Sequence, residues 1–232
     1  MCGRVYVKST LAEMVGRFSF ADPAGVEGLA NALPRYNGAP RQSYPIIVAD
    51  EPAKGSAMFV SAVWGLIPSW QKEQKAGGRP PPINARSETI KTNGLFRRPY
   101  ASQRCLIPID GFFEWKDIHG TGKEKQPYAI AMKDGSPFAL AGIFDIWKDP
   151  KTDENIRTFC VITCEPNSLM ATIHDRMPVI IAPEDYARWI GSESDPEDLM
   201  KPFPAEKMTM WKIKRDVGNV RNNTPDLLDP LD

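Results

Sequence analysis

The second residue of the chain carries two groups that could react with one carbon atom. Cys2 follows the initiator methionine, and Met aminopeptidases act when the second residue is small, so we expect Cys2 to become the mature N-terminus. At pH 7 roughly one α-amine in eight is unprotonated, against about one lysine side chain in 2,500. The thiol is intrinsically nucleophilic. An amine that forms an imine and a thiol that closes on the same carbon give a thiazolidine, so the pair indicates capture of an aldehyde.

Two acid–base candidates lie in the middle and the C-terminal half of the chain. Glu114 belongs to the run GFFEWK at residues 111–116, which is typical of a strand. A carboxyl group flanked by aromatic side chains is expected to be partly desolvated, which suits acid–base work. His174 is followed by an aspartate and an arginine, and histidine titrates near neutral pH. The only other histidine, His119, lies in a polar glycine-rich turn and is expected to be solvated.

Metal and disulfide chemistry are not indicated by the cysteines. The chain has four, at positions 2, 105, 160 and 164. They form no C-x-x-C pair, and two histidines leave a four-ligand zinc site without a compact set of ligands. Free cysteines are usually small buried apolar residues, as we expect for Cys105 and Cys160. We therefore predict no metal and no cofactor.

Short strands, rather than long helices, must position these candidates. The 22 prolines are spread along the chain and indicate many turns. Apolar patterning and turn signals predict strands over residues 44–49, 57–64, 104–109, 111–116, 128–133, 138–147, 158–163 and 208–213. Successive strands without intervening helices favour antiparallel pairing.

The predicted helices are few and short. Thr10 and Glu13 have the spacing of a capping box, and one apolar face follows at Leu11, Met14, Val15 and Phe18. A second short helix is predicted from Pro183 to Gly191, and a further turn within 195–200. The sequence thus predicts an α+β fold, mainly antiparallel sheet with a few short peripheral helices.

The organisation along the chain indicates one domain. We predict this domain over residues 1–221, with a polar, Gly- and Pro-rich surface loop at 71–82. Residues 222–232 are polar and proline-punctuated and are expected to form a loose C-terminal tail.

Charge and hydropathy exclude some classes of protein. Lys+Arg and Asp+Glu both number 29, so composition gives no support for a general polyanion-binding protein, although a local basic groove is compatible with it. No apolar run reaches the roughly 18 residues of a membrane helix. The N-terminus has no signal-peptide layout. We expect a cytoplasmic protein with no membrane partner.

Six segments, in order, resemble the SOS-response-associated peptidase (SRAP) family. They are MCGR at 1–4, RYNGAP at 35–40, WGLIP at 64–68, INAR at 83–86, FFEWK at 112–116 and HDRMP at 174–178. The VGNV segment at 217–220 also fits. The resemblance spans nearly the whole chain, and it implies the barrel-like fold of that family.

The resemblance implies a covalent reaction with DNA. SRAP proteins bind single-stranded DNA that carries an abasic site and link to it. Cys2 matches the family nucleophile after loss of Met1, which the family removes autoproteolytically, and the ring-opened sugar supplies the aldehyde. Asn84 matches the residue that positions the linkage. Glu114 matches the acid–base residue for imine formation, and His174 matches the residue for sugar ring opening and for reversal.

The expected DNA-binding residues are arginines together with apolar platforms. Arg4, Arg86 and Arg176 match family arginines at the DNA backbone, and arginine's planar fork suits phosphate oxygens. We assign Asn37, in a matched segment, to the same set. Trp70 and Pro40 are either platforms for bases or ordinary core residues. The expected partner is single-stranded abasic DNA, with an adjoining duplex left open, and the expected state is a monomer that is nucleoid-associated when DNA-bound.

Two alternatives stay open at this point. The first is a cysteine-dependent peptidase, since Cys2 with His174 and Glu114 could support more than removal of Met1. The second is a non-catalytic reader of modified DNA, which would bind without Cys2. The proline run RPPP at 79–82 precedes INAR and implies a stiffer or differently shaped loop on the DNA side.

Overall fold

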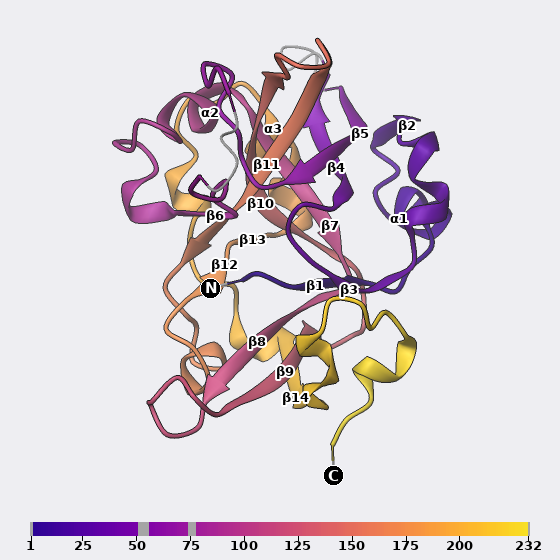
Figure 1. Cartoon of the computed structure of the whole chain (residues 1–232), viewed down its shortest axis with the longest axis vertical. Helices are drawn as coiled ribbons and strands as arrows, with labels where there is room; N and C mark the ends of the chain where they lie inside the picture. The colour runs from indigo at the N-terminus through magenta and orange to yellow at the C-terminus, as the bar shows by residue number, and fades with distance from the viewer. Residues whose placement is uncertain (1, 51–55, 74–77, 232) are drawn as a thin grey trace.

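Two β-sheets meet along the N-terminal segment of the chain, which runs between them (Figure 1). The computed structural model describes residues 2–50, 56–73 and 78–231. No helix in this described part is long and apolar enough to cross a membrane.

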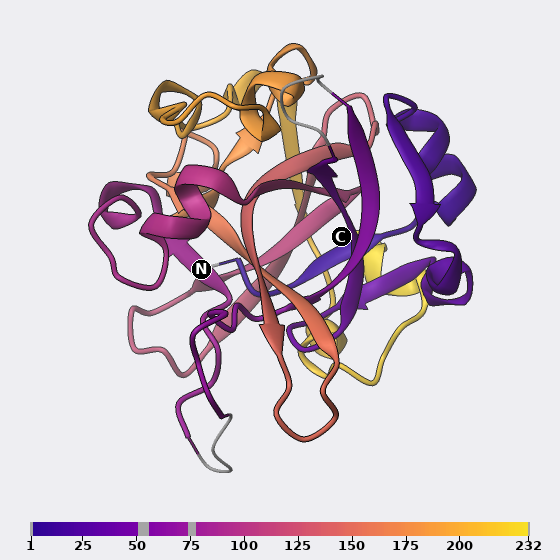
Figure 2. The same ribbon diagram turned by 90° about the horizontal axis from the view of Figure 1, so that it is seen from above.

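The larger sheet closes into a barrel, seen from above in Figure 2. Its strands are β2 (Ala21–Gly25), β4 (Ser43–Ala49), β5 (Ala57–Trp64), β6 (Asn84–Arg86), β7 (Arg104–Ile109), β10 (Phe138–Lys148), β11 (Asn155–Cys164), β12 (Met177–Pro178) and β13 (Ile180–Ile181). Neighbours pair in the order β11–β10–β7–β4–β5, and β5 then pairs in parallel with β11, which completes the ring. Closure leaves these five strands without an open edge.

The smaller sheet lies below the barrel in Figure 1. Its order is β14–β9–β8–β1–β3, and all its pairs are antiparallel. The strands are β1 (Val5–Val7), β3 (Arg35–Gly38), β8 (Gly111–Asp117), β9 (Lys125–Met132) and β14 (Met208–Lys212). The chain passes from barrel to smaller sheet at Asp110, whose carboxylate accepts bonds from the amide and hydroxyl of Ser9.

Helices are short and peripheral. They are α1 (Leu11–Arg17), α2 (Arg97–Ser102) and α3 (Tyr186–Ile190). The predicted capping box is present: the Glu13 amide donates to Thr10 Oγ1, and the Thr10 amide donates to the Glu13 carboxylate. The 3-10 segments are Glu27–Ala32, Ser87–Thr89, Met170–Thr172, Pro183–Asp185, Glu197–Leu199, Ala205–Lys207, Arg215–Gly218 and Pro225–Leu228.

The predicted α+β class and all eight predicted strands are confirmed, with ends shifted by at most a few residues. Sequence patterning missed the short strands β1, β2, β3, β6, β12 and β13, and it missed helix α2. The predicted helix from Pro183 consists of a 3-10 turn followed by α3.

A glycine allows the N-terminal strand to lie on the smaller sheet. In the β1–β8 register Tyr6 lies opposite Gly111. A Cβ atom at Gly111 would lie 2.3 Å from the Tyr6 ring, so a larger residue would push β1 off β8. The close approach sets the path of the chain that ends at Cys2.

The C-terminal segment is packed against the smaller sheet, rather than loose as predicted. Leu227 is buried and belongs to a small core with Tyr6, Phe113 and Val217. Trp211 Nε1 donates to a carbonyl of the same segment at 2.7 Å. The polar composition hid this packing because, among the described residues of the segment, only Leu227 and Leu228 join the apolar cluster.

Candidate active site

The N-terminal segment continues along β8 beyond the end of β1. The amide of Phe113 donates to the carbonyl of Arg4 at 3.0 Å. The chain therefore already lies along β8 at Arg4, two residues after Cys2. The Cys2 side chain is fully buried. In Figure 1 the segment that leads into β1 lies between the barrel and the rest of the smaller sheet.

Asn84 reaches Cys2 from the barrel side. It opens β6, which pairs in parallel with β11, and its Nδ2 donates to the Cys2 carbonyl at 2.9 Å. Among the described residues its Oδ1 is buried without a hydrogen-bond partner. A buried orphan acceptor is costly, and such exceptions concentrate at functional sites. Asn84 therefore holds the main chain of Cys2 from the barrel side, with one buried acceptor left over.

Glu114 and His174 face one another across the junction of the two sheets. His174 Nε2 lies 3.8 Å from Glu114 Oε2, and the side chains are 21% and 3% exposed. The carboxyl is thus the inner group and the imidazole connects it with solvent. The predicted desolvation of Glu114 is confirmed by its burial.

The backbone sets the tautomer of His174. The amide of Arg176 donates to Nδ1 at 3.0 Å, so neutral His174 carries its proton on Nε2, toward Glu114. The exposed Asp175 carboxylate lies 2.9 Å from the same Nδ1, a contact that stabilises the imidazole only when it is doubly protonated.

The thiol of Cys2 is held in its neutral form. Burial, and secondly the nearby Glu114 carboxylate, raise the pKa of the Cys2 thiol. At neutral pH the thiol keeps its proton, and its reaction needs a base. Glu114 is the carboxylate whose charge acts on this thiol.

Arg176 is occupied by internal partners. Its guanidinium pairs with both oxygens of Glu88, and Nη2 also donates to the Thr163 carbonyl at 2.7 Å. The bond to Glu88 raises the pKa of Arg176 and lowers that of Glu88. A phosphate would have to compete with Glu88 for this arginine.

Arg4 and Asn37 are likewise bonded within the protein. Arg4 Nη1 donates to Asn37 Oδ1 and to the Val217 carbonyl, both at 2.7 Å. Burial lowers the pKa of Arg4. Asn37 is 1% exposed, so it makes no surface for DNA in this conformation.

Arg86, Trp70 and Pro40 lie at the surface. Arg86 is exposed at the end of β6. Trp70 is 62% exposed, which excludes the core-packing alternative for it. Pro40 borders a cavity of about 600 Å³ that extends to Ile83, the residue before Asn84.

The sequence did not single out several residues around the site. Glu88 contacts Arg176, and Asp175 contacts His174. Asp175 lies within the HDRMP segment and Glu88 lies two residues after INAR, so an acid near a candidate residue was the available signal. Three cations border the Pro40 cavity: Arg41, Arg79 and Lys151. No local signal marks them, because the fold brings them together from separate loops.

The four predicted catalytic residues thus come together, while the predicted DNA-binding residues divide into surface and internally bonded groups. Among the described residues, no group of three or more His, Cys, Asp or Glu side chains is placed to hold a metal ion.

The fold and the site match one protein family. The family model described as "SOS response associated peptidase (SRAP)" matches residues 1–220, and the chain belongs to this family. It is 37% identical to the abasic site processing protein YoqW of Bacillus subtilis over 99% of both chains. It is 31% identical to the abasic site processing protein HMCES of Rattus norvegicus, covering 100% of this chain and 76% of that protein.

A solved structure confirms the barrel-like fold. A crystal structure of a protein from Bacteroides thetaiotaomicron superposes with a TM-score of 0.85 at 29% identity, over 99% of this chain and 100% of that one.

Proposed function

We propose that this protein processes abasic sites in single-stranded DNA by linking itself to them through Cys2. The observation that carries the proposal is the convergence of Asn84, Glu114 and His174 on a buried N-terminal cysteine. It agrees with the names of the relatives, which are abasic site processing proteins.

The reaction begins when Met1 is removed. Hydrolysis of the Met1–Cys2 amide consumes one water, releases methionine and leaves the α-amine of Cys2. We propose that the site catalyses this step on itself. The amine adds to the aldehyde of the ring-opened sugar, and the resulting carbinolamine loses one water to give an imine.

The thiol then closes the ring. The Sγ–H bond breaks, sulfur bonds to the imine carbon, and the proton passes to nitrogen, which gives a thiazolidine with no redox change. Because the thiol is neutral, Glu114 takes and returns this proton. His174 exchanges protons between Glu114, the sugar oxygen and solvent, and Asn84 holds the carbonyl of Cys2.

DNA is proposed to approach over the open side of the site. Arg86 carries an exposed positive charge next to Asn84, and Arg41, Arg79 and Lys151 add charge around the Pro40 cavity. Trp70 offers an exposed ring for stacking with a base. Arg4 and Arg176 are proposed to reach a phosphate only by sharing their present partners. We propose that a monomer acts in this way in the cytoplasm, where its DNA partner lies.

A peptidase acting on other proteins fits the site less well. Cysteine peptidases use a thiolate with a lowered pKa, whereas burial raises the pKa of the Cys2 thiol. A cysteine consumed by its product also suits a linking protein better than a hydrolase that turns over.

A denaturing gel tests the proposal. Purified protein is incubated with a single-stranded oligonucleotide that has one abasic site, beside an oligonucleotide with a tetrahydrofuran analogue, which has no aldehyde. We expect a shifted band with the first only, with the mass of protein without Met1 plus DNA minus one water. Cys2→Ala keeps the α-amine and should abolish the stable adduct. Binding without any denaturation-resistant adduct would instead favour the reader hypothesis.

A further inference from the structure

The arginine two residues from Cys2 is held by the far end of the chain. Arg4 donates to the carbonyl of Val217 at 2.7 Å and to that of Gly218 at 3.2 Å. Its third partner is Asn37 Oδ1 on β3. Its guanidinium also lies 6.0 Å from the centre of the Trp115 ring on β8. The side chain is thus fixed from the C-terminal segment and from both strands beside β1.

Asn37 gathers the same segment. Its Nδ2 donates to the carbonyls of Val217, Asn219 and Asn222 at 3.1, 3.0 and 3.0 Å. In return, Asn223 Oδ1 accepts from the amides of Tyr36 and Asn37 at 2.8 and 3.1 Å. Residues 217–223, here called the C-terminal clamp, therefore close over β3 by side-chain bonds in both directions.

Two apolar side chains anchor the clamp, one at its first residue and one four residues beyond its last. Val217 is fully buried and Leu227 is 3% exposed, and both belong to one buried cluster with Tyr6 of β1 and Phe113 of β8. In Figure 1 the yellow C-terminal segment lies beside β1 and β3. The family model ends at residue 220, so Asn222 and Asn223 lie beyond the part that it matches.

We propose that the C-terminal clamp is a positioning device for Cys2, with Asn37 and Asn223 as positioning residues. The clamp holds Arg4, and Arg4 in turn holds the chain just before β1. Asn84 holds the Cys2 carbonyl from the barrel side. Held from both sides, the amine and the thiol meet one carbon atom. This step rests on the proposed function. It gives Asn37 a role that does not need contact with DNA.

The physical basis is orientation rather than binding. Two nucleophiles on one residue react in sequence only when both stay near the same carbon, and small displacements of reacting groups lower rates strongly. The thiol is buried, so loosening of the clamp should also expose it. The clamp therefore predicts two independent effects, a slower covalent step and a more accessible Cys2.

The exposed Asn223 is the residue to change, because its substitution leaves the side-chain bonds of Asn37 in place. Asn223→Ala removes the side-chain oxygen that accepts from the amides of both Tyr36 and Asn37. Asn223→Asp keeps an acceptor oxygen and serves as the rescue, and Asn155→Ala, on an exposed asparagine of the distant β10–β11 hairpin, is the matched control. Crosslinking rates are measured at saturating abasic oligonucleotide, and the Kd is measured with the tetrahydrofuran analogue.

Access to Cys2 is measured without DNA. Iodoacetamide labelling followed by peptide mass mapping compares Cys2 with the buried Cys105 and Cys160 as internal references. For Asn223→Ala we expect about a tenfold slower covalent step and about a tenfold faster labelling of Cys2, the factor that one or two hydrogen bonds supply. The Kd, and the labelling of the reference cysteines, should stay within about twofold of wild type on that scale. Asn223→Asp and Asn155→Ala should behave as wild type.

Two results would overturn the proposal that the clamp positions Cys2. One is a wild-type rate with wild-type labelling in Asn223→Ala. The other is a raised Kd with an unchanged rate at saturation, which would make the segment a DNA-binding surface. If wild-type protein forms no adduct, the proposed function fails, and the labelling experiment still decides whether the clamp controls access to Cys2.

Discussion

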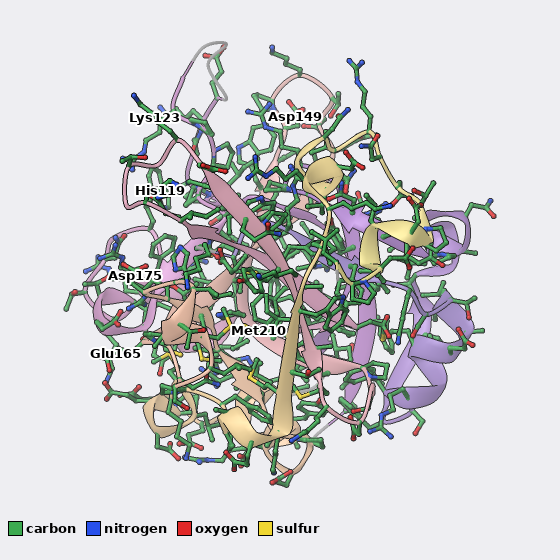
Figure 3. The ribbon with its side chains drawn as sticks, turned by 90° about the horizontal axis from the view of Figure 1, so that it is seen from below. His119, Lys123, Asp149, Glu165, Asp175 and Met210 are labelled. Carbon is green, nitrogen blue, oxygen red and sulfur yellow. The ribbon has the colours of Figure 1, made fainter. Side chains whose placement is uncertain are left out.

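Two histidine–glutamate pairs involve the β8–β9 hairpin, and they differ mainly in burial. His119 Nε2 lies 3.3 Å from Glu124 Oε2 near the β8–β9 turn, with the side chains 62% and 46% exposed. His174 lies farther from Glu114, at 3.8 Å, but these side chains are 21% and 3% exposed. Figure 3 shows His119 out on its loop, on the same side of the molecule as Asp175, the neighbour of His174.

The comparison shows that contact distance does not identify a working pair. In water the interaction of the closer pair is screened, and an exposed ion pair contributes about 0–1 kcal/mol. Glu124 is also shared with Arg215 at 2.8 Å. The buried pair lies beside Cys2, where burial first and the Glu114 charge second raise the pKa of the thiol. Burial beside the Cys2 thiol, rather than a shorter distance, distinguishes the Glu114–His174 pair.

The largest expected effect on the crosslinking rate distinguishes Glu114 from Glu124. Glu114→Gln keeps the shape of the side chain but removes the base, so crosslinking should slow by about 10²-fold or more, the usual size of an acid–base contribution. Glu124→Gln is the matched control and should keep the wild-type rate. Single-turnover gel assays at pH 7 give both rates, and thermal melting shows whether each variant is folded. Equal rates for the two variants would remove Glu114 from the mechanism.

A smaller effect separates the two histidines. His174→Gln leaves Glu114 in place but interrupts proton exchange with solvent, so we expect the crosslinking rate to fall by about tenfold, below the usual range for an acid–base group. His119→Gln, in the screened pair, should not change it. The same assay compares them with release of DNA from preformed adducts. A normal rate of capture and of release in His174→Gln would contradict a role for the imidazole.

Local signals predicted the parts of the fold that local interactions build. The capping box of Thr10 and Glu13 is complete within four residues, so α1 was visible in the sequence. Strand β8 was visible because its aromatic run is itself the strand. By contrast, β1 is three residues long, and it is a strand only because β3 and β8 flank it from distant parts of the chain.

The candidate site shows the same contrast between local signals and contacts from distant parts of the chain. Resemblance singled out Cys2, Glu114 and His174, and the structure brings them together, while their roles in the reaction stay predictions. It could not show that Arg4 and Asn37 bond to carbonyls 180 or more residues away. Main-chain carbonyls carry no side-chain signature, so no pattern in the sequence points to such partners.

The last prediction concerns Cys164, a buried thiol that the proposed reaction does not use. Cys164 is 2% exposed, and burial raises the pKa of its thiol from 9.0 to about 12. Between these values the unfolded chain loses this proton and the folded chain keeps it, so folding stability falls as pH rises. One such group contributes a slope of about 1.4 kcal/mol per pH unit, and below pH 9 it contributes none.

Urea unfolding under reducing conditions from pH 8 to 10.5 measures this slope. Cys164→Ala should be less stable at pH 8, because it leaves a small cavity, but its stability should fall less steeply above pH 9 than that of the wild type. Its crosslinking rate at pH 7 should be unchanged, because the thiol has no part in the proposed reaction. Parallel stability curves for the two proteins would show that Cys164 does not titrate differently in the folded state. A slower crosslinking rate in a fully folded Cys164→Ala would show that a thiol outside the Glu114–His174 pair also serves the reaction, and burial beside that pair would no longer distinguish the site.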